Sequence, residues 1–179
     1  KFLSAAAIER GVAALRRFRT VADRFEAPVT AVATSAVREA VNKESFIRRI
    51  AHETGIRLEI VSGLEEARLV YLGVLQALPV LNREILLIDL GGGSTEFLVG
   101  KKRKVLYDSS LKIGAIRMTD RFFPGGVTSP KSIREARRFI RGILSPVRRD
   151  TRMHDVDLVV GTSGTIVNLA NIVRCRSGR

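Results

Sequence analysis

The sequence contains a single cysteine, no tryptophan and few aromatic residues of any kind. One cysteine, Cys175, excludes an internal disulfide framework and is typical of a reducing compartment. Aromatic residues make up 6% of the chain, too few to form a base-stacking platform among its basic residues. No apolar run is long enough to span a bilayer, and residues 2–7 are too short an apolar stretch for a signal peptide. We therefore expect a cytoplasmic protein with neither a membrane nor a specific nucleic acid as its partner.

Acidic residues are scarce relative to basic ones. The chain has 18 Asp and Glu against 31 Lys and Arg, a formal net charge of +13. Such a charge attracts polyanions, including nucleic acid, polyphosphate and nucleotides. The excess lies mostly in the second half, in residues 101–104 and in the arginines between residues 134 and 152. Because arginine-rich helix faces are commonly plain solvated surface, charge alone supports a polyanionic partner without identifying it.

A hydrophobic content of 45% over 179 residues is enough to bury a core. Apolar periodicity predicts strands and helices in alternation, which indicates an α/β protein with mixed sheets. The expected helices cover residues 6–25, 35–53, 64–78, 113–122, 130–146 and 165–173, and the expected strands cover residues 29–33, 57–61, 85–90, 95–99, 105–110 and 156–160. An exposed junction near residues 80–84 predicts two lobes, residues 1–82 and 83–179.

The most informative segment is residues 85–99, which read ILLIDLGGGSTEFLV. A short apolar strand brings Asp89 to its end, and a polar loop and Glu96 follow. The loop residues are Gly91, Gly92, Gly93, Ser94 and Thr95. Glycine allows positive φ and brings N–H groups close to an anion, while carboxylates hold a metal ion or a water. The segment predicts phosphate chemistry with a hard cation; a plain glycine-rich β-hairpin is the alternative.

A second glycine-containing turn lies between the last predicted strand and the last predicted helix. Its residues are Gly161, Thr162, Ser163, Gly164 and Thr165. Free N–H groups at the positive end of a helix favour a phosphate oxygen. No lysine follows, so this is not a Walker A loop, and a plain capped turn is the alternative.

Two other positions carry groups suited to phosphate chemistry. Glu65 and Glu66 open a predicted helix, where Glu65 can pair with Arg68 and one glutamate can take a proton from water. Arg38 shares a helix face with Asn42 and can grip phosphate oxygens with two hydrogen bonds. Because such residues are more often solvated surface groups, neither position carries a function alone.

Five segments, taken in order, resemble the Ppx/GppA phosphatases, a family of exopolyphosphatases and guanosine pentaphosphate phosphohydrolases. They read ATSAVREAVN, SGLEEARLVYLGV, IDLGGGSTEFLVG, SLKIGAIRMTDRFF and GTSGTIVNLA. The resemblance covers nearly the whole chain. It implies the actin/hexokinase/Hsp70-like (ribonuclease H-like) fold, in which two related α/β lobes enclose a phosphate-binding cleft.

The resemblance also implies a role for each candidate residue. By this resemblance, Glu66 is the general base for the attacking water, and Asp89 and Glu96 organise Mg²⁺ and that water. Residues 91–95 and 161–165 form two phosphate loops. Arg38 neutralises charge on the phosphate chain. The expected reaction releases terminal orthophosphate from inorganic polyphosphate. Guanosine pentaphosphate is the alternative substrate, and the basic second half favours polyphosphate.

The chain departs from the family pattern at both ends. Family members begin with a strand and an Asp-x-Gly-Ser-Asn-Ser type loop, and further elements follow the GTSGTIVNLA segment; neither is found in these residues. We therefore expect a fragment or a truncated relative, whose exposed sheet edges favour pairing as a homodimer. A non-catalytic polyanion-binding module is the alternative from another class, and a sugar or acetate kinase fits less well.

Overall fold

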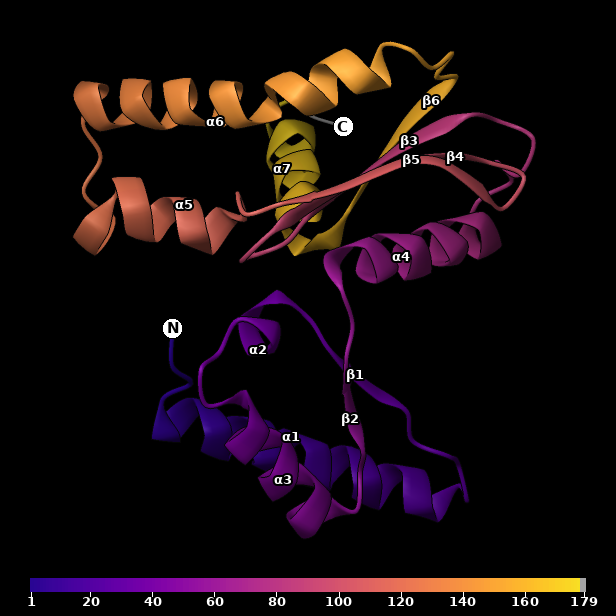
Figure 1. Ribbon diagram of the computed structural model, residues 1–179, viewed down its shortest axis with the longest axis vertical. Coiled ribbons are helices and arrows are strands. Elements are labelled where there is room, and N and C mark those ends of the chain that lie inside the picture. The colour runs from indigo at the N-terminus through magenta and orange to yellow at the C-terminus, as the bar shows by residue number, and fades with distance from the viewer. Residues whose placement is uncertain (178–179) are drawn as a thin grey trace. The chain divides into compact units, whose positions relative to one another are not determined.

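The computed structural model describes residues 1–177 and divides into two compact units (Figure 1). The first unit, Lys1–Ser62, contains helices on a short parallel strand pair. Its elements are α1 (Ala5–Arg24), β1 (Ala31–Ala33), α2 (Ser35–Arg38), α3 (Lys43–Thr54) and β2 (Leu58–Ile60). Its core is formed by Val12 of α1, Phe46 and Ile50 of α3, and Ile56.

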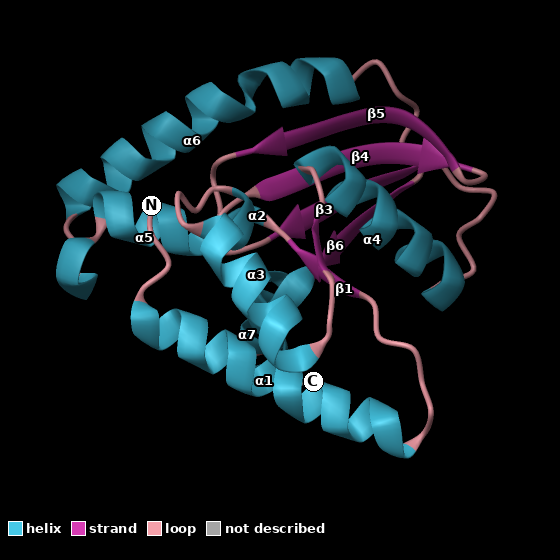
Figure 2. Cartoon of the chain, turned by 60° about the horizontal axis from the view of Figure 1, so that its bottom comes forward, coloured by secondary structure: helices cyan, strands magenta, loops and turns pink. Residues whose placement is uncertain are grey.

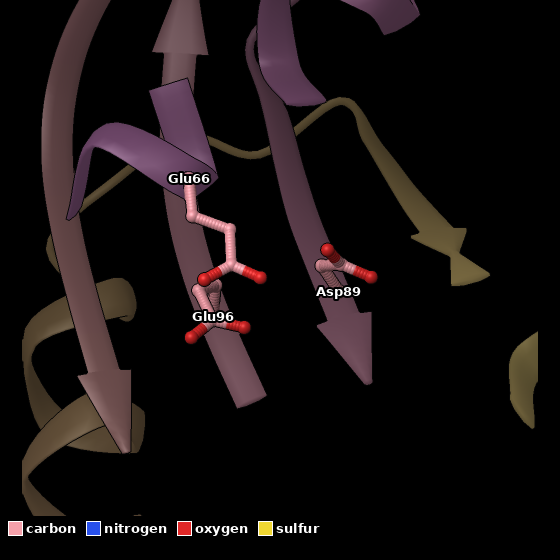
Figure 3. Close-up of side chains that lie close together, drawn as sticks. All are labelled: Glu66, Asp89 and Glu96. Atoms are coloured by element: carbon pink, nitrogen blue, oxygen red, sulfur yellow. The ribbon is translucent and has the colours of Figure 1, made fainter. Parts of the chain in front are cut away.

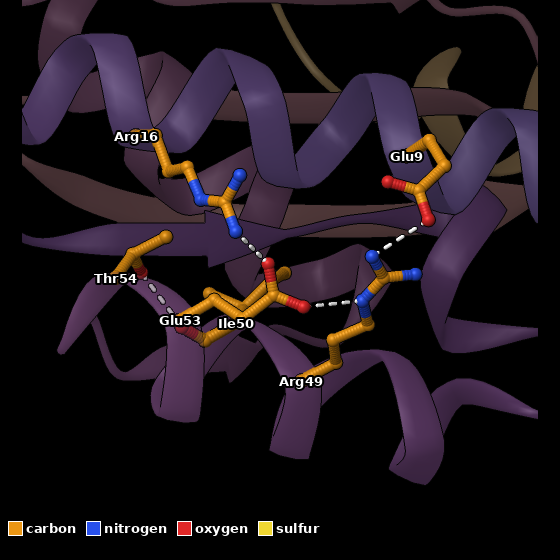
Figure 4. Close-up of polar contacts among 6 residues, drawn as sticks. All are labelled: Glu9, Arg16, Arg49, Ile50, Glu53 and Thr54. Carbon is orange, nitrogen blue, oxygen red and sulfur yellow. Dashed lines mark hydrogen bonds and ion pairs between the residues drawn. The ribbon is translucent and has the colours of Figure 1, made fainter.

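Ion pairs on the surface of the first unit connect α1 with α3 (Figure 4). Arg49 lies between Glu9, at 2.6 Å, and Glu53, at 2.5 Å, and Arg16 of α1 also pairs with Glu53. Exposed pairs of this kind contribute little stability each. The buried apolar contacts between the two helices therefore hold this unit together.

The predicted helix over residues 35–53 is wrong in one respect, because the structure divides it into α2 and α3. Asn42 lies in the break, where its side chain accepts a hydrogen bond from the N–H of Leu3 and donates one to the carbonyl of Leu3, both at 2.9 Å. An asparagine that bonds backbone groups in this way competes with helix formation. A long-range contact, invisible to periodicity, therefore ends α2.

The second unit starts at Gly63 and is built on a mixed four-stranded sheet (Figure 2). Its strands are β3 (Ile85–Leu90), β4 (Thr95–Lys101), β5 (Lys104–Leu111) and β6 (Leu158–Thr162), in the order β5-β4-β3-β6. Its helices are α4 (Gly63–Ala77), α5 (Ala115–Phe122), the 3₁₀ turn η1 (Pro124–Gly126), α6 (Pro130–Thr151) and α7 (Ser163–Arg176). β3 runs antiparallel to β4 and parallel to β6.

Alternation along β3 decides which side chains face α4. Ile85 and Leu87 are buried against Ala67 and Tyr71 of α4, and Leu86 between them is less buried. Successive side chains in a strand point to opposite faces of the sheet. Asp89, two residues beyond Leu87, therefore lies on the face that α4 covers.

Most predicted element boundaries differ from the observed ones by one or two residues, and two differences involve the last two helices. Pro146 does not end its helix: α6 continues to Thr151, because Val147 is buried and extends the apolar side of the helix past the proline. The last helix begins at Ser163 rather than at Thr165, so β6 and α7 follow each other directly.

The boundary between the two compact units lies between Ser62 and Gly63 in the chain, whereas the predicted lobe boundary lies between residues 82 and 83. The difference arises because α4 packs on the sheet that follows it in the chain. The division into lobes 1–82 and 83–179 stays a prediction. Within the described residues, no helix combines the length and the apolar character needed to cross a membrane.

Candidate active site

Glu66, Asp89 and Glu96 form a cluster of carboxylates in the second unit (Figure 3). Glu66 lies in the first turn of α4, Asp89 is next to the end of β3, and Glu96 is the second residue of β4. One oxygen from each side chain lies within 4.8 Å of the other two. The structure thus brings together the three carboxylates that the sequence analysis singled out.

The register of the sheet explains this convergence. Asp89 pairs directly with Glu96 across the antiparallel strands β3 and β4, so both side chains point to the same face. That face is the one on which α4 packs. The first turn of α4 therefore brings Glu66 to the Asp89–Glu96 pair.

The cluster is largely removed from solvent. Glu96 is 1% exposed and Asp89 is 9% exposed. Burial raises the pKa of Glu96, and the neighbouring Glu66 and Asp89 raise it further, whereas hydrogen bonds from Ser94 and Ser110 lower it. The Ser110 hydroxyl donates to Oε1 of Glu96 at 2.8 Å. Crowded, buried carboxylates are stabilised by a cation, because each repels the others and has lost its water.

A second observation supports a cation at this cluster. The Oδ1 atom of Asp89 is buried and has no hydrogen-bond partner within the described part of the chain. An unsatisfied buried acceptor is unfavourable unless another group binds it. Carboxylate oxygens are the ligands that hard divalent cations such as Mg²⁺ prefer. The residues present therefore fit such a cation.

The pKa of Glu96 leads to a prediction for the metal-free protein. Since its folded pKa lies above the unfolded value of 4.5, its contribution to stability is present at acidic pH and is lost as the pH rises through the folded pKa. Glu96→Gln should therefore raise the free energy of unfolding at neutral pH, with no gain at acidic pH. Thermal unfolding in a chelator at both pH values measures this. A variant that is less stable at neutral pH would contradict the environment described for Glu96.

The glycine loop that follows Asp89 is held by its carbonyl groups. The carbonyls of Gly91 and Gly92 accept hydrogen bonds from the N–H groups of Ala115 and Arg117, at 2.9 and 3.1 Å, at the start of α5. Nε of Arg117 donates to the carbonyl of Gly93 at 2.7 Å. Within the described residues, no hydrogen bond is found for the N–H groups of Gly92, Gly93 and Ser94. These N–H groups are suited to bind an anion.

The reason for the glycines differs from the sequence prediction. None of Gly91, Gly92 and Gly93 has positive φ. Space is the constraint: a Cβ on Gly92 would lie 2.9 Å from Cδ1 of Ile116. Gly114 matters in the same way, because its Cβ would lie 2.4 Å from the carbonyl carbon and oxygen of Gly92. The close approach of α5, and not a left-handed turn, requires glycine at position 114, where a Cβ would meet backbone, whereas the contact at Gly92 is with the end of a side chain.

Gly114 and Arg117 are supporting residues to which the sequence analysis gave no role. Both lie in the segment SLKIGAIRMTDRFF, which contributed to the family resemblance. In the sequence, a glycine just before a helix indicates an ordinary helix cap, and an arginine in the first turn indicates a solvent-exposed side chain. Only the packing of α5 on the loop reveals their function.

The second predicted phosphate loop is not a loop in the structure. Gly161 and Thr162 end β6, and Ser163 opens α7 with a φ of 73°. A non-glycine residue in this region is strained, and such strain concentrates at functional sites. The Ser163 hydroxyl donates to the carbonyl of Leu90 at 2.5 Å. This bond joins the end of β6 to the end of β3.

The strained junction brings Thr162 beside the carboxylate cluster. Thr162 is in register with Asp89 across the parallel strands, so the two side chains share a face. Like Oδ1 of Asp89, Oγ1 of Thr162 is buried without a hydrogen-bond partner in the described residues. Gly164 and Thr165 lie in the first turn of α7. Among residues 161–165, Thr162 is the one that lies next to the cluster, because it pairs with Asp89.

Other candidates have structural contacts of their own. Thr95 is buried and its hydroxyl donates to the carbonyl of Ile113 at 3.3 Å. Arg38 is the last residue of α2, in the first unit, and donates to the carbonyl of Val61 at 2.7 Å. Their roles in phosphate binding stay predictions. The predicted pairing of Glu65 with Arg68 is confirmed at 2.7 Å, and it lowers the pKa of Glu65.

Comparison with known proteins finds one family. A model of the Ppx/GppA phosphatase family matches residues 1–177. A bifunctional 3-dehydroquinate synthase/phosphatase from Fusobacterium nucleatum is 38% identical over 127 residues, which is 69% of this chain and 19% of that protein.

Two solved structures are similar over almost the whole chain. An exopolyphosphatase from Cytophaga hutchinsonii has a TM-score of 0.90 at 32% identity, over 99% of this chain and 57% of that one. The Ppx/GppA family member from Aquifex aeolicus has a TM-score of 0.76 at 34% identity, over 96% of this chain and 54% of that one. The chain thus spans little more than half the length of these relatives. The fold is of the actin/hexokinase/Hsp70-like class, as the family resemblance implied.

Proposed function

Because the chain belongs to the Ppx/GppA phosphatase family, we propose that it is part of a phosphohydrolase that releases terminal orthophosphate from inorganic polyphosphate. The observation that carries this proposal is the cluster of Glu66, Asp89 and Glu96 beside the glycine loop. The buried carboxylates can bind a cation, and the backbone N–H groups beside them, which have no other hydrogen-bond partner in the described residues, can bind a phosphoryl group.

In this proposal Glu66 is the general base. Within the cluster it is the carboxylate carried by a helix, whereas Asp89 and Glu96 are fixed on paired strands. Glu66 would accept the proton of the attacking water, and the N–H groups of the glycine loop would bind the oxygens of the terminal phosphoryl group. Catalysis of phosphoryl transfer consists mainly of positioning and charge stabilisation, because the transition state is loose.

Asp89 and Glu96 would hold Mg²⁺. When bound, Mg²⁺ would supply positive charge to the phosphoryl oxygens and orient the water. The unsatisfied Oδ1 of Asp89 supports this assignment, because it is an acceptor in need of a partner. Arg38 would neutralise further phosphates of the chain.

The proposal is tested by incubating the protein with long-chain polyphosphate or guanosine pentaphosphate and Mg²⁺, and measuring released orthophosphate. We expect release from polyphosphate that stops in a chelator. Faster release from guanosine pentaphosphate would favour the alternative substrate. If polyphosphate binds but no orthophosphate forms from either compound, the protein is a polyanion-binding module and the proposed hydrolysis is wrong.

Thr162 provides a separate prediction. Thr162→Val keeps the shape of the side chain and removes a buried hydroxyl that has no partner in the described residues. Such a change is neutral or stabilising for the fold, by up to about 1 kcal/mol. If the hydroxyl binds a water or a phosphoryl oxygen beside Asp89, orthophosphate release should fall about tenfold, as for one lost hydrogen bond. Thr162→Ser should retain activity; equal activity of the valine variant would remove Thr162 from the site.

A further inference from the structure

Helix α6 carries a basic face that the proposed hydrolysis does not use. The helix has 22 residues, so it is about 33 Å long at roughly 1.5 Å per residue. Its exposed cations are Lys131, Arg134, Arg137, Arg138, Arg141, Arg148, Arg149 and Arg152. At 3.6 residues per turn they fall on one side, and the buried Ala136 and Val147 lie on the other. In Figure 1, α6 runs along the side of the sheet away from α4.

These cations are largely without acidic partners. Arg149 pairs with Asp150 at 2.9 Å, but no ion pair is found for Arg141, Arg148 or Arg152 in the described part of the chain. Rows of like charge on one helix face repel each other. A ligand of opposite charge removes that repulsion.

The second half of this face is hollowed. One shallow pocket is lined by Arg141, Leu144, Ser145 and Arg148, and a second by Ser145, Arg148, Arg149, Arg152 and Met153. The two pockets share Ser145 and Arg148, so they adjoin on the helix surface, and together they are here called the α6 groove. Guanidinium groups bind phosphate oxygens with two hydrogen bonds, and a serine hydroxyl adds a donor.

We propose that the α6 groove binds an inorganic polyphosphate chain through its phosphoryl oxygens, at a site separate from the carboxylate cluster. The identity of the polymer rests on the proposed function. The exposed basic side chains share one side of α6 along its length, which matches a single linear chain of charges better than a compact anion.

The lining of the groove lacks the side chains that hold single-stranded nucleic acid. Duplex DNA also carries a phosphate backbone, so it serves as the competitor in the test below. Single strands are held by bases stacked on aromatic rings. The residues that line the α6 groove include no aromatic side chain. A polymer of phosphate without bases is the occupant that these residues favour.

The test is a binding measurement that does not depend on hydrolysis. Arg141, Arg148 and Arg152 are replaced together by glutamine, and Arg10, Arg17 and Arg24, exposed on α1, are replaced together as the control. Affinity for long-chain polyphosphate is measured over a series of salt concentrations in a chelator, with duplex DNA as the competitor polyanion. Both variants lower the net charge equally and leave Glu66, Asp89 and Glu96 in place.

We expect the groove variant to bind polyphosphate at least about tenfold more weakly, with the slope of log affinity against log salt reduced by about 2, since roughly 0.7 counterions are released per contact. The control should change neither value comparably. An equal loss in the control would overturn the proposal in favour of diffuse charge, and duplex DNA binding of equal strength would replace polyphosphate by a nucleic-acid backbone.

Orthophosphate release, followed in parallel, separates this inference from the proposed function. Groove-dependent binding by a protein that releases no orthophosphate would support the groove and refute the hydrolysis. If polyphosphate is hydrolysed but the groove variant binds it as tightly as the unchanged protein, the proposed hydrolysis is supported and the α6 groove is refuted.

Discussion

Replacing Glu66 by glutamine should lower orthophosphate release by about 10²–10⁴-fold, the usual effect of removing a general base. Glutamine keeps the size of the side chain and its position in the first turn of α4, but it cannot accept a proton from water. Binding of polyphosphate should be unchanged or slightly tighter, because a negative charge is removed from the site. Initial rates at saturating substrate measure the expected loss.

The adjacent glutamate offers a matched control. Glu65→Gln removes the same charge one residue away, from a side chain that pairs with Arg68 outside the cluster. We expect nearly full activity from this variant. Equal losses in the two variants would point to a general effect of charge at the start of α4, and full activity of Glu66→Gln would exclude it as the base.

Gly114→Ala should have the second large effect. The backbone of Gly114 has a φ of −65°, which alanine tolerates, so the only obstacle is the new Cβ at 2.4 Å from the carbonyl of Gly92. Backbone atoms cannot yield as a flexible side chain can, so α5 and the glycine loop must move apart. We expect a loss of about 1–3 kcal/mol in stability from overpacking. Because catalysis is sensitive to displacements of about 1 Å, activity should fall about 10²-fold.

Gly142→Ala is the control for this change. Gly142 lies in the interior of α6 with nothing near its absent Cβ, so alanine should stabilise the protein by about 0.5–1 kcal/mol. The free energy of unfolding should therefore rise in Gly142→Ala and fall in Gly114→Ala, and the initial rate should fall in Gly114→Ala alone. A Gly114→Ala protein with normal stability and activity would contradict the close packing of α5 on the loop.

Local patterns in the sequence predicted most of the elements and two residues of the cluster. The short apolar run before Asp89 and the carboxylates on either side of the glycine loop were enough to select Asp89 and Glu96, whereas the family resemblance selected Glu66. The break at Asn42 was missed because it depends on a hydrogen bond to Leu3, which is distant in the sequence. The continuation of α6 through Pro146 was missed because its cause is the burial of Val147.

The glycine loop shows a different limit of the sequence. Three consecutive glycines predicted a tight turn with positive φ, whereas none of them has positive φ in the structure and α5 packs closely on Gly92. A run of glycines indicates that side chains would be unfavourable at these positions, but it does not reveal which element packs against them. For the same reason the sequence assigned no role to Gly114 and Arg117, which contact the glycine loop. The alignment of Thr162 with Asp89 depends on the register of β3 and β6, which the sequence does not reveal.

The most direct test of the central claim is the fate of the water oxygen. Hydrolysis of guanosine pentaphosphate or polyphosphate in ¹⁸O-labelled water with Mg²⁺ is followed by mass spectrometry of the products. If Glu66 directs water at the terminal phosphoryl group, the label appears in the released orthophosphate, and release is lost in Glu66→Gln. Label found in the shortened substrate, or orthophosphate released equally well by Glu66→Gln, would contradict the account.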